Sequence, residues 1–377
     1  MYFLRVLLFF LLAISTNACK KSNHYNNTID KANKEKYAEG FSIKKHKGHT
    51  MIYIHKPYTN TSKTMRYLLV PKTDKIPACE KSIQIIRTPV EKIVTTSSTH
   101  IPILELLNVE RSLVGFPNTS FISSKKTRQL INEKKVLELG ESENINMERL
   151  LALKPDLVMS FAIDDLNKSF HTIKKMGIPV LLNGDWIEKT PLGRVEWIYV
   201  FGALYQKEQE ADRIFKQIER EYNTIKKLAL SAKTKPTILS GAIFKDVWYL
   251  PGGKSFMAHY FKDAQTNYLW RDNNQSGSLA LSFEKVLEKA KNATFWIGCD
   301  QYETKEHLVK GGHHYRQFNP FLSDNIYTSA NCKGEKGGLL YFELGPIQPH
   351  IVLKDIVKIT HPELLPDYQP FFFEKLI

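Results

Sequence analysis

The chain has 377 residues, of which 42% are hydrophobic and 24% are charged, and its formal net charge is +14 at pH 7. These proportions are typical of a globular protein and exclude a wholly disordered chain, a collagen-like chain or a coiled-coil rod. The basic excess lies mainly before residue 86, where about 15 Lys and Arg residues stand against about 5 Asp and Glu. No basic reading helix accompanies this excess, so we expect no nucleic-acid partner.

The first 40 residues predict export and a lipid anchor. Arg5 precedes an apolar run at residues 6–14, which is too short to span a bilayer and has the length of a signal-peptide core. Ala18 and Cys19 follow, and a small residue before a cysteine at this place resembles the lipidation motif of bacterial lipoproteins, although Thr16 stands where Leu is usual. We therefore expect a signal peptide over residues 1–18, lipid attachment at Cys19 and a polar tether over residues 19–40. An ordinary secretory peptide with an incidental cysteine is the alternative.

Three further cysteines allow one disulfide in an exported protein. Cys299 ends a predicted strand at residues 294–298, and Cys332 follows another at residues 325–328. Consecutive strands can bring such ends together, so we expect a Cys299–Cys332 disulfide and a free Cys79.

Short β-rich runs come first after the tether, at residues 41–45, 50–55 and 65–70. They predict a small, basic, antiparallel extension over residues 41–86. From residue 91 strands and helices alternate, with strands at residues 92–96, 113–116, 156–161 and 179–182 and helices at residues 101–107, 147–153 and 164–176. This alternation predicts an α/β lobe with a parallel sheet over residues 87–190.

Helical patterns then run through residues 192–204 and 206–231, where apolar residues recur every three or four positions. They predict a helical connector over residues 191–233. Alternation resumes with strands at residues 237–244, 247–250, 294–298 and 325–328 and helices at residues 256–261, 283–289 and 351–359. The predicted fold is therefore two parallel-sheet α/β lobes joined by a single long helix, with a second lobe over residues 234–377 and a small N-terminal β-rich extension.

Four segments are similar to sequence motifs of one known family, at residues 92–107, 146–158, 176–180 and 281–287. From about Arg87 to its end the chain resembles the ABC-transporter substrate-binding proteins for iron-siderophores, haem and cobalamin. Two α/β lobes joined by one long helix are that family's architecture. The most specific match is NMERLLALKPDLV at residues 146–158, and the resemblance covers about three quarters of the chain.

The resemblance implies a periplasmic, lipid-anchored binding protein that captures an iron complex or cobalamin between its lobes. It would pass the ligand to an ABC permease, whose partner ATPase hydrolyses ATP, and would act as a monomer without a resident cofactor. Glu148 and Glu284 fall on the positions whose acidic side chains dock onto the permease in this family. Without the resemblance, both are simply carboxylates in first helical turns, where the helix dipole favours them.

Ligands of open α/β sheets bind outside the carboxyl ends of the strands, so the crevice between the lobes is the expected site. Aromatic side chains there suit a planar organic ligand, and lysines suit its negative groups, although each aromatic is equally compatible with core packing. The candidate ligand-binding residues are Ser98, His100, Trp186, Phe244, Lys245, Trp248, Lys254 and Tyr302.

Three alternatives have a basis in the sequence. An accessory binding lipoprotein would keep the fold and lack the permease. A direct metal-ion binder needs converging His and carboxylate ligands, and His100 stands alone at a predicted strand end. An enzyme acting on the captured complex needs a nucleophile or acid–base pair, and no local nucleophile motif is present in the sequence. We therefore predict no catalytic and no metal-ligating residue.

Overall fold

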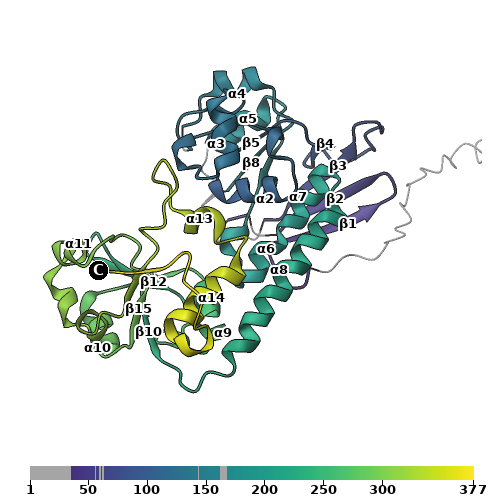
Figure 1. Ribbon diagram of the computed structural model, residues 1–377. Coiled ribbons are helices and arrows are strands. Elements are labelled where there is room, and N and C mark those ends of the chain that lie inside the picture. Colours follow the sequence, from purple (N-terminus) through teal and green to yellow (C-terminus); the bar gives the residue numbers. More distant parts are fainter. Residues whose placement is uncertain (1–34, 56, 59–60, 62, 143, 162–167) are drawn as a thin grey trace, which may run out of the picture.

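The computed structural model describes residues 35–55, 57–58, 61, 63–142, 144–161 and 168–377. Two α/β lobes, a helical connector and an N-terminal β-sheet make up this part of the chain (Figure 1). The predicted signal peptide and Cys19 lie outside the described residues. Among the described residues, no helix combines the length and the apolarity that crossing a bilayer requires.

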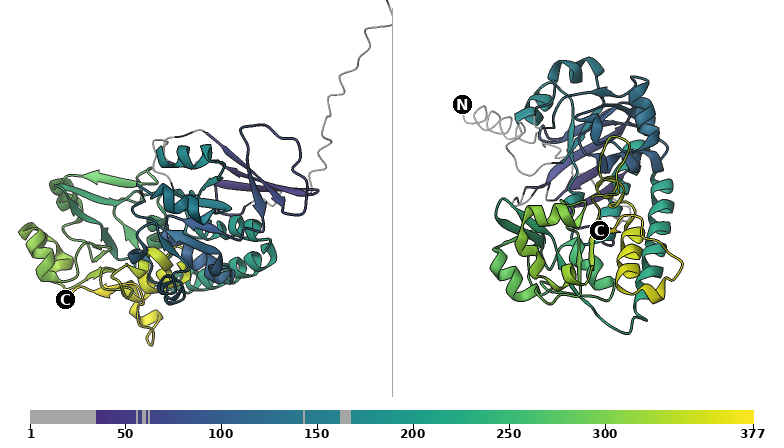
Figure 2. Two further views of the ribbon diagram at one scale, coloured as in Figure 1. Left: turned by 90° about the horizontal axis from the view of Figure 1, so that it is seen from above. Right: turned by 60° about the vertical axis from the view of Figure 1, so that its left-hand side comes forward.

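The N-terminal extension is a sheet of four strands in the order β1 (Phe41–His46), β2 (His49–Ile54), β3 (Met65–Pro71) and β4 (Gln84–Thr88). The three predicted β-rich runs are therefore confirmed. The sheet is mixed and not purely antiparallel, because β3 pairs with β4 in parallel. Its inward face shares one hydrophobic core with the first lobe, and Figure 2 shows the purple strands lying against that lobe.

The first lobe contains a five-stranded parallel sheet in the order β7-β6-β5-β8-β9. The strands are β5 (Ile93–Thr95), β6 (Leu113–Phe116), β7 (Leu137–Glu138), β8 (Leu157–Ser160) and β9 (Val180–Leu182). Its helices are α2 (Ile101–Leu106), α3 (Lys125–Asn132), α4 (Met147–Leu153) and α5 (Lys168–Lys175). The sequence signals for α4 are local: the Asn146 side chain accepts the Arg149 N–H, and Lys154 adopts a left-handed conformation before Pro155.

The connector consists of α6 (Pro191–Glu196), α7 (Ile198–Tyr205) and α8 (Glu208–Ala229). Helix α8 has 22 residues, so it is about 33 Å long at 1.5 Å per residue. Ile214 and Ile218 on α8 belong to the core of the first lobe, whereas Tyr222, one turn further along, belongs to the core of the second. One helix therefore joins both cores, as predicted (Figure 1).

The second lobe contains a five-stranded sheet in the order β13-β10-β15-β16-β17, in which only the last pair is antiparallel. Its strands are β10 (Thr237–Ser240), β13 (Asn267–Tyr268), β15 (Phe295–Ile297), β16 (Ile326–Thr328) and β17 (Glu374–Lys375). Its helices are α9 (Phe256–Asp263), α10 (Phe283–Ala290), α11 (Lys305–Gly311), α12 (Asn319–Leu322), α13 (Leu340–Leu344) and α14 (Pro349–Thr360).

The predicted strand at residues 237–244 is in fact two strands. It breaks at Gly241, which has a φ of +77° and where a Cβ would lie 1.9 Å from the Tyr249 carbonyl oxygen. Only glycine fits such a position. The chain therefore folds back into a separate antiparallel sheet of β11 (Ala242–Phe244), β12 (Val247–Pro251) and β14 (Ser278–Leu281).

The predicted Cys299–Cys332 disulfide is wrong in this structure, where Cys79, Cys299 and Cys332 are all free thiols. Strands β15 and β16 are neighbours as expected. The Cys299 thiol is nevertheless buried against the Tyr327 carbonyl, whereas the Cys332 thiol faces the carbonyl of Phe371. The Cys299 and Cys332 thiols therefore contact different parts of the chain and not each other.

Candidate ligand site between the lobes

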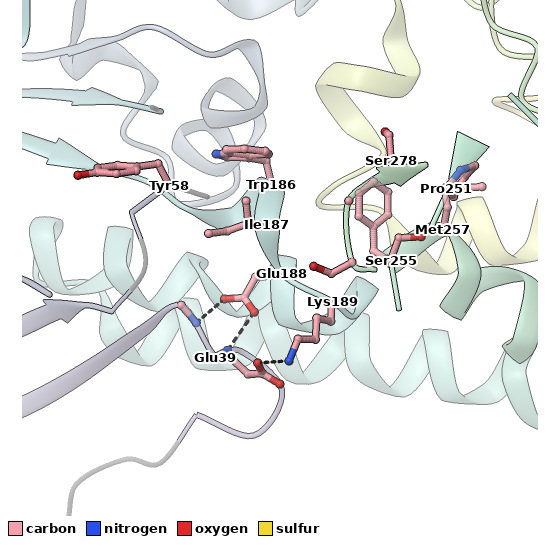
Figure 3. Close-up of a pocket in the computed structure, with 14 residues that line it drawn as sticks. Glu39, Tyr58, Trp186, Ile187, Glu188, Lys189, Pro251, Ser255, Met257 and Ser278 are labelled. Carbon is pink, nitrogen blue, oxygen red and sulfur yellow. Dashed lines mark hydrogen bonds and ion pairs between the residues drawn. The ribbon is translucent and has the colours of Figure 1, made fainter. Parts of the chain in front are cut away.

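A cavity of about 550 Å³ lies between the two lobes on the side of the N-terminal sheet (Figure 3). This volume is within the range of small-molecule sites. Three parts of the chain line it: the extension, the segment that follows β9, and the second lobe. The lining residues are Glu39, Gly40, Tyr58, Trp186, Ile187, Glu188, Lys189, Pro251, Ser255, Phe256, Met257, Ser276, Gly277 and Ser278.

Trp186 forms part of the first-lobe wall. It follows β9 at the carboxyl end of the strand, where the sequence predicts a ligand contact. Its indole Nε1 is buried and has no hydrogen-bond partner among the described residues. A buried donor without an acceptor costs free energy, and an acceptor atom of a ligand would satisfy it.

The wall from the second lobe is held by the connector. Ser255 caps α9 by accepting the Ala258 N–H at 3.2 Å, and Phe256 begins the helix. The guanidinium carbon of Arg194 on α6 lies 4.5 Å from the centre of the Phe256 ring, and its Nη2 lies 3.6 Å from Asp185 Oδ2. This cation–π contact fixes the aromatic wall to α6 of the connector.

The third wall is the chain just before β1. The carboxylate of Glu188 accepts the backbone N–H groups of Glu39 and Gly40 at 2.9 Å each and the indole N–H of Trp197 at 2.9 Å. Burial raises the pKa of Glu188 to about 7, against the opposing effect of these three donors. Beside it, Lys189 forms an ion pair with Glu39 at 2.6 Å (Figure 3).

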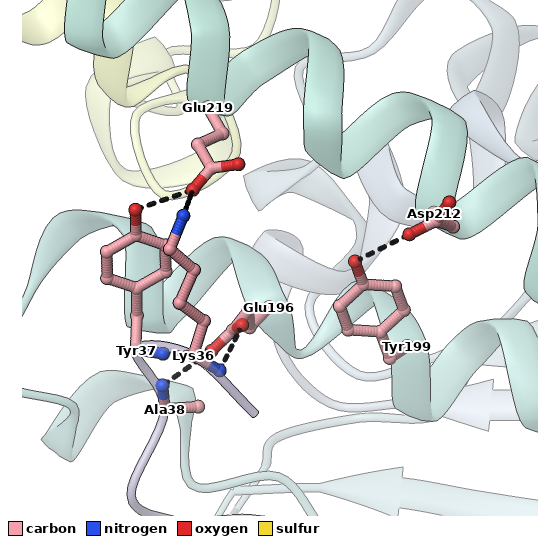
Figure 4. Close-up of polar contacts among 7 residues, drawn as sticks. All are labelled: Lys36, Tyr37, Ala38, Glu196, Tyr199, Asp212 and Glu219. Atoms are coloured by element: carbon pink, nitrogen blue, oxygen red, sulfur yellow. Dashed lines mark hydrogen bonds and ion pairs between the residues drawn. The ribbon is translucent and has the colours of Figure 1, made fainter. Parts of the chain in front are cut away.

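A second carboxylate anchors the residues immediately before this wall. Glu196 on α6 accepts the backbone N–H groups of Lys36, Tyr37 and Ala38 at 2.7, 2.7 and 2.6 Å (Figure 4). The Tyr37 hydroxyl also donates to Glu219 on α8 at 2.5 Å. The predicted tether over residues 19–40 is therefore too long at its C-terminal end, because residues 36–40 belong to the folded body.

On the β6 side the two lobes touch directly. Glu343 on α13 accepts the backbone N–H groups of Ser123 and Ser124 at 2.7 and 2.9 Å. Burial and the charge of Glu105 raise the pKa of Glu343 to about 7, although the N–H bonds act in the opposite direction. The interlobe space is thus closed at this end and hollow at the end where Trp186 lies.

Several predicted ligand residues are core residues instead. Trp248 is fully buried, lies 5.3 Å from the Trp296 ring and donates its indole N–H to Ser240 at 3.1 Å. Tyr302 is 7% exposed, and its hydroxyl lies 3.3 Å from that of Tyr315. Both predictions are wrong. Their positions after strands predicted that these rings lie in the crevice, but they pack in the aromatic cluster of the second lobe instead.

Three other predicted residues lie at the surface without lining the cavity. Phe244 is the exposed last residue of β11 and Lys245 begins the turn to β12, and the fold-back at Gly241 carries both away from the carboxyl edge. Lys254 is exposed and adjoins the lining residue Ser255. None of the three is a neighbour of Trp186 in the cavity wall.

Ser98 and His100 lie in the helical turn after β5, against which α13 of the second lobe packs. Ser98 is half-buried and does not line the cavity. His100 is 1% exposed, and neither ring nitrogen has a partner among the described residues. Burial lowers its pKa to about 4, so the ring is neutral at pH 7. His100 therefore lies between the lobes, outside the cavity wall.

The sequence reasoning missed the contributions of Glu39, Tyr58 and Glu188. The candidate ligand residues all lie at or after Ser98, and no local signal in residues 39–58 predicts a ligand contact. Glu188 stands two residues after Trp186, so a longer strand-end segment would have included it. Among the described residues, no cluster of three or more His, Cys, Asp or Glu side chains is placed to hold a metal ion.

Glu148 and Glu284 are exposed in the first turns of α4 and α10. Asn146 and Ser282 cap these helices through the same type of side-chain bond, at the third residue after the cap. Helix α4 lies in the first lobe and α10 at the far end of the second (Figure 1). The two carboxylates therefore mark two widely separated points, one on each lobe.

Comparison with known proteins identifies the family. A family model described as periplasmic binding protein matches residues 93–320. An uncharacterised lipoprotein of Methanocaldococcus jannaschii is 25% identical over 324 residues, which cover 82% of this chain and 76% of the relative. The solved periplasmic haem-binding protein HutB of Vibrio cholerae has a TM-score of 0.56 at 14% identity, covering 72% of this chain and 99% of that one.

A periplasmic binding protein from Veillonella parvula has a TM-score of 0.60 at 13% identity and covers 87% of this chain and 96% of that one. Residues 93–377 make up only about three quarters of this chain. The structural match therefore extends into the N-terminal sheet. The chain as a whole belongs to the periplasmic binding protein family, whose members are the ligand-binding components of ABC transporters.

Proposed function

We propose that this protein is the ligand-capturing lipoprotein of an ABC importer for an organic metal complex, namely a ferric siderophore, haem or cobalamin. The observation that carries the proposal is the cavity between the lobes, in which Trp186, Phe256 and Tyr58 gather around about 550 Å³. Large aromatic surfaces suit an organic ligand better than a bare ion. The role in capture follows from family membership and this cavity together.

Delivery would use the two separated carboxylates. Glu148 and Glu284 stand exposed on different lobes, so basic sockets on a permease would fix the orientation of both lobes at once. Such charge pairing contributes orientation and association rate more than affinity. Lipid attachment at Cys19 would keep the protein at the membrane as a monomer beside its permease, with residues before Lys36 as the tether.

Binding by the full chain in detergent tests this proposal. Intrinsic tryptophan fluorescence would be followed during titration with haem, an uncharged ferric trihydroxamate, a ferric tris-catecholate, cyanocobalamin and free divalent ions. We expect saturable quenching at micromolar or lower Kd by at least one organic complex, with Trp186 as the main reporter because Trp197, Trp248 and Trp296 are fully buried. A response to free ions alone would establish direct metal binding instead, and conversion of the ligand during incubation would establish an enzyme.

A further inference from the structure

The N-terminal segment gives the cavity a charge that the two lobes alone would not give. Three charged side chains line the cavity among the described residues: Glu39, Glu188 and Lys189. Glu39 comes from the segment just before β1, and its carboxylate forms an ion pair with the Lys189 ammonium at 2.6 Å. The one cation in the wall is therefore already neutralised by this segment.

The cation beneath the wall is also paired. Arg194 lies under the Phe256 ring. Its guanidinium forms an ion pair with Asp185 at 3.6 Å, and the side chains of Arg194 and Asp185 are both nearly buried. Lys245 and Lys254 lie outside the cavity. A ligand with several negative charges would thus enter a cavity whose described lining residues carry the Glu188 carboxylate and the Glu39–Lys189 ion pair, but no unpaired cation. Such burial of unpaired negative charge is costly.

The segment that imposes this charge is fixed in place. Glu188 and Glu196 together hold five consecutive backbone N–H groups, from Lys36 to Gly40. Tyr37 packs against the hydrophobic cores of both lobes, and a Cβ at Gly40 would lie 2.8 Å from Glu188 Oε1. Hydrogen bonds to a carboxylate are stronger than neutral ones. These contacts therefore fix the wall to the rest of the folded body.

One buried polar group of the described lining residues that has no partner is a hydrogen-bond donor. The buried indole N–H of Trp186 has no partner among the described residues, and its nitrogen points toward Tyr58 in Figure 3. Other uncharged lining residues are apolar or hydroxyl-bearing, such as Ile187, Met257 and Ser278. An uncharged oxygen acceptor on the ligand would satisfy this N–H without bringing a charge into the cavity.

We propose that the N-terminal wall, through Glu39, restricts this cavity to organic complexes that carry no net negative charge and that present an oxygen acceptor to Trp186. This inference rests on the proposed function and narrows its ligand class. Uncharged or cationic hydroxamate complexes and corrinoids fit the description. Haem with two propionates and trianionic tris-catecholate complexes do not.

The test compares complexes that differ in charge. The full chain, Glu39→Lys and the control Glu91→Lys would be titrated with an uncharged and a cationic ferric trihydroxamate, cyanocobalamin, haem and a trianionic ferric tris-catecholate at low and physiological salt. Glu91 is a matched control, because it is exposed and ion-paired with Lys72 at 3.0 Å but does not line the cavity.

We expect the wild type to bind the uncharged or cationic complexes at least about tenfold more tightly than the trianionic one. Glu39→Lys should reduce this preference by about fivefold at low salt and less at physiological salt, since the charge is partly exposed and screened. Trp186→Phe should weaken binding of the preferred complex by about fivefold through the lost donor. Glu91→Lys should change nothing.

Two results would overturn the inference and spare the proposed function: tightest binding of a trianionic complex or haem, or an unchanged preference in Glu39→Lys. A wild-type chain that binds no organic complex overturns the proposed function and this inference with it. The two failures are therefore distinguished by whether the wild type binds.

Discussion

Glu343 of the second lobe accepts the backbone N–H of Ser123 in the first lobe at 2.7 Å, although the two residues are 220 positions apart in the chain. Its other carboxylate oxygen takes the N–H of Ser124. This is a buried contact across the lobe boundary, on the side away from the cavity. It joins the two lobes at that end.

Removing this carboxylate should open the contact. We expect Glu343→Ala to lower the free energy of unfolding by about 2 kcal/mol, because two N–H groups lose their acceptor, and to increase the radius of gyration. Urea denaturation and small-angle X-ray scattering measure the two effects. Glu335→Ala, at an exposed carboxylate in the loop that precedes α13, is the control and should match the wild type. An unchanged radius with unchanged stability in Glu343→Ala would show that the contact does not hold the lobes.

The anchor of the N-terminal segment makes a similar prediction at Glu196. Glu196→Gln leaves one acceptor oxygen for three N–H groups, so the amides of residues 36–38 should exchange with solvent at least tenfold faster. Hydrogen exchange with mass spectrometry measures this directly. Glu210→Gln, which breaks an exposed ion pair with Arg213 on α8, should leave those amides protected. Equal exchange in both variants would mean that residues 36–38 are held by something other than Glu196.

His100 predicts a pH dependence of stability. Its native pKa is about 4, and the unfolded value is about 6.5. Between these values the unfolded chain binds a proton that the native state does not, so acidification from pH 6.5 to pH 4 removes stability. The loss amounts to at most about 3 kcal/mol for this group.

His100→Phe should abolish that loss, since the ring nitrogens have no partners to lose and Phe201 already packs at 5.8 Å. The measured quantity is the difference in unfolding free energy between the variant and the wild type, which should grow as pH falls from 7 to 4. Glu188 and Glu343 have raised pKa values and act in the opposite direction between about pH 4.5 and 7, but they cancel in this difference. A difference that does not vary with pH would contradict the assignment.

Permease docking predicts a separation of binding from transport. Glu148→Arg and Glu284→Arg together should lower ligand uptake in cells by at least tenfold, because charge reversal places like charges against the basic sockets. Ligand affinity of the purified variant should be unchanged. Glu288→Arg, at an exposed carboxylate one turn further along α10, is the control and should transport normally. Full uptake in the double variant would favour an accessory lipoprotein without a permease.

The elements that the sequence predicted well have local causes. Helix α4 begins after Asn146 and ends before Pro155, and both signals lie within a few residues of the helix ends. The connector was predictable because the apolar positions of α8 recur with helical periodicity over six turns. Local signals of this kind do not depend on the rest of the chain.

The site was harder to predict because it depends on distant contacts. The Lys36 N–H reaches Glu196 across 160 residues of sequence, and no periodicity or motif connects the two. Trp248 was wrongly predicted to line the crevice because the chain folds back at Gly241 and buries this ring in the core. The sequence does not reveal that turn, since residues 237–244 form one mainly apolar run. Trp186 alone among the predicted residues lines the cavity, since its position at the end of β9 follows from strand order.

Calorimetric titration of the full chain with the complex that it binds best tests whether the cavity beside Trp186 holds the ligand. We expect one ligand per chain at micromolar or lower Kd, and a loss of at least tenfold in affinity for Trp186→Ala with the control Phe244→Ala unaffected. One-to-one binding with unchanged affinity in Trp186→Ala would place the ligand elsewhere. Binding that is lost in Phe244→Ala, at the exposed end of β11, would do the same.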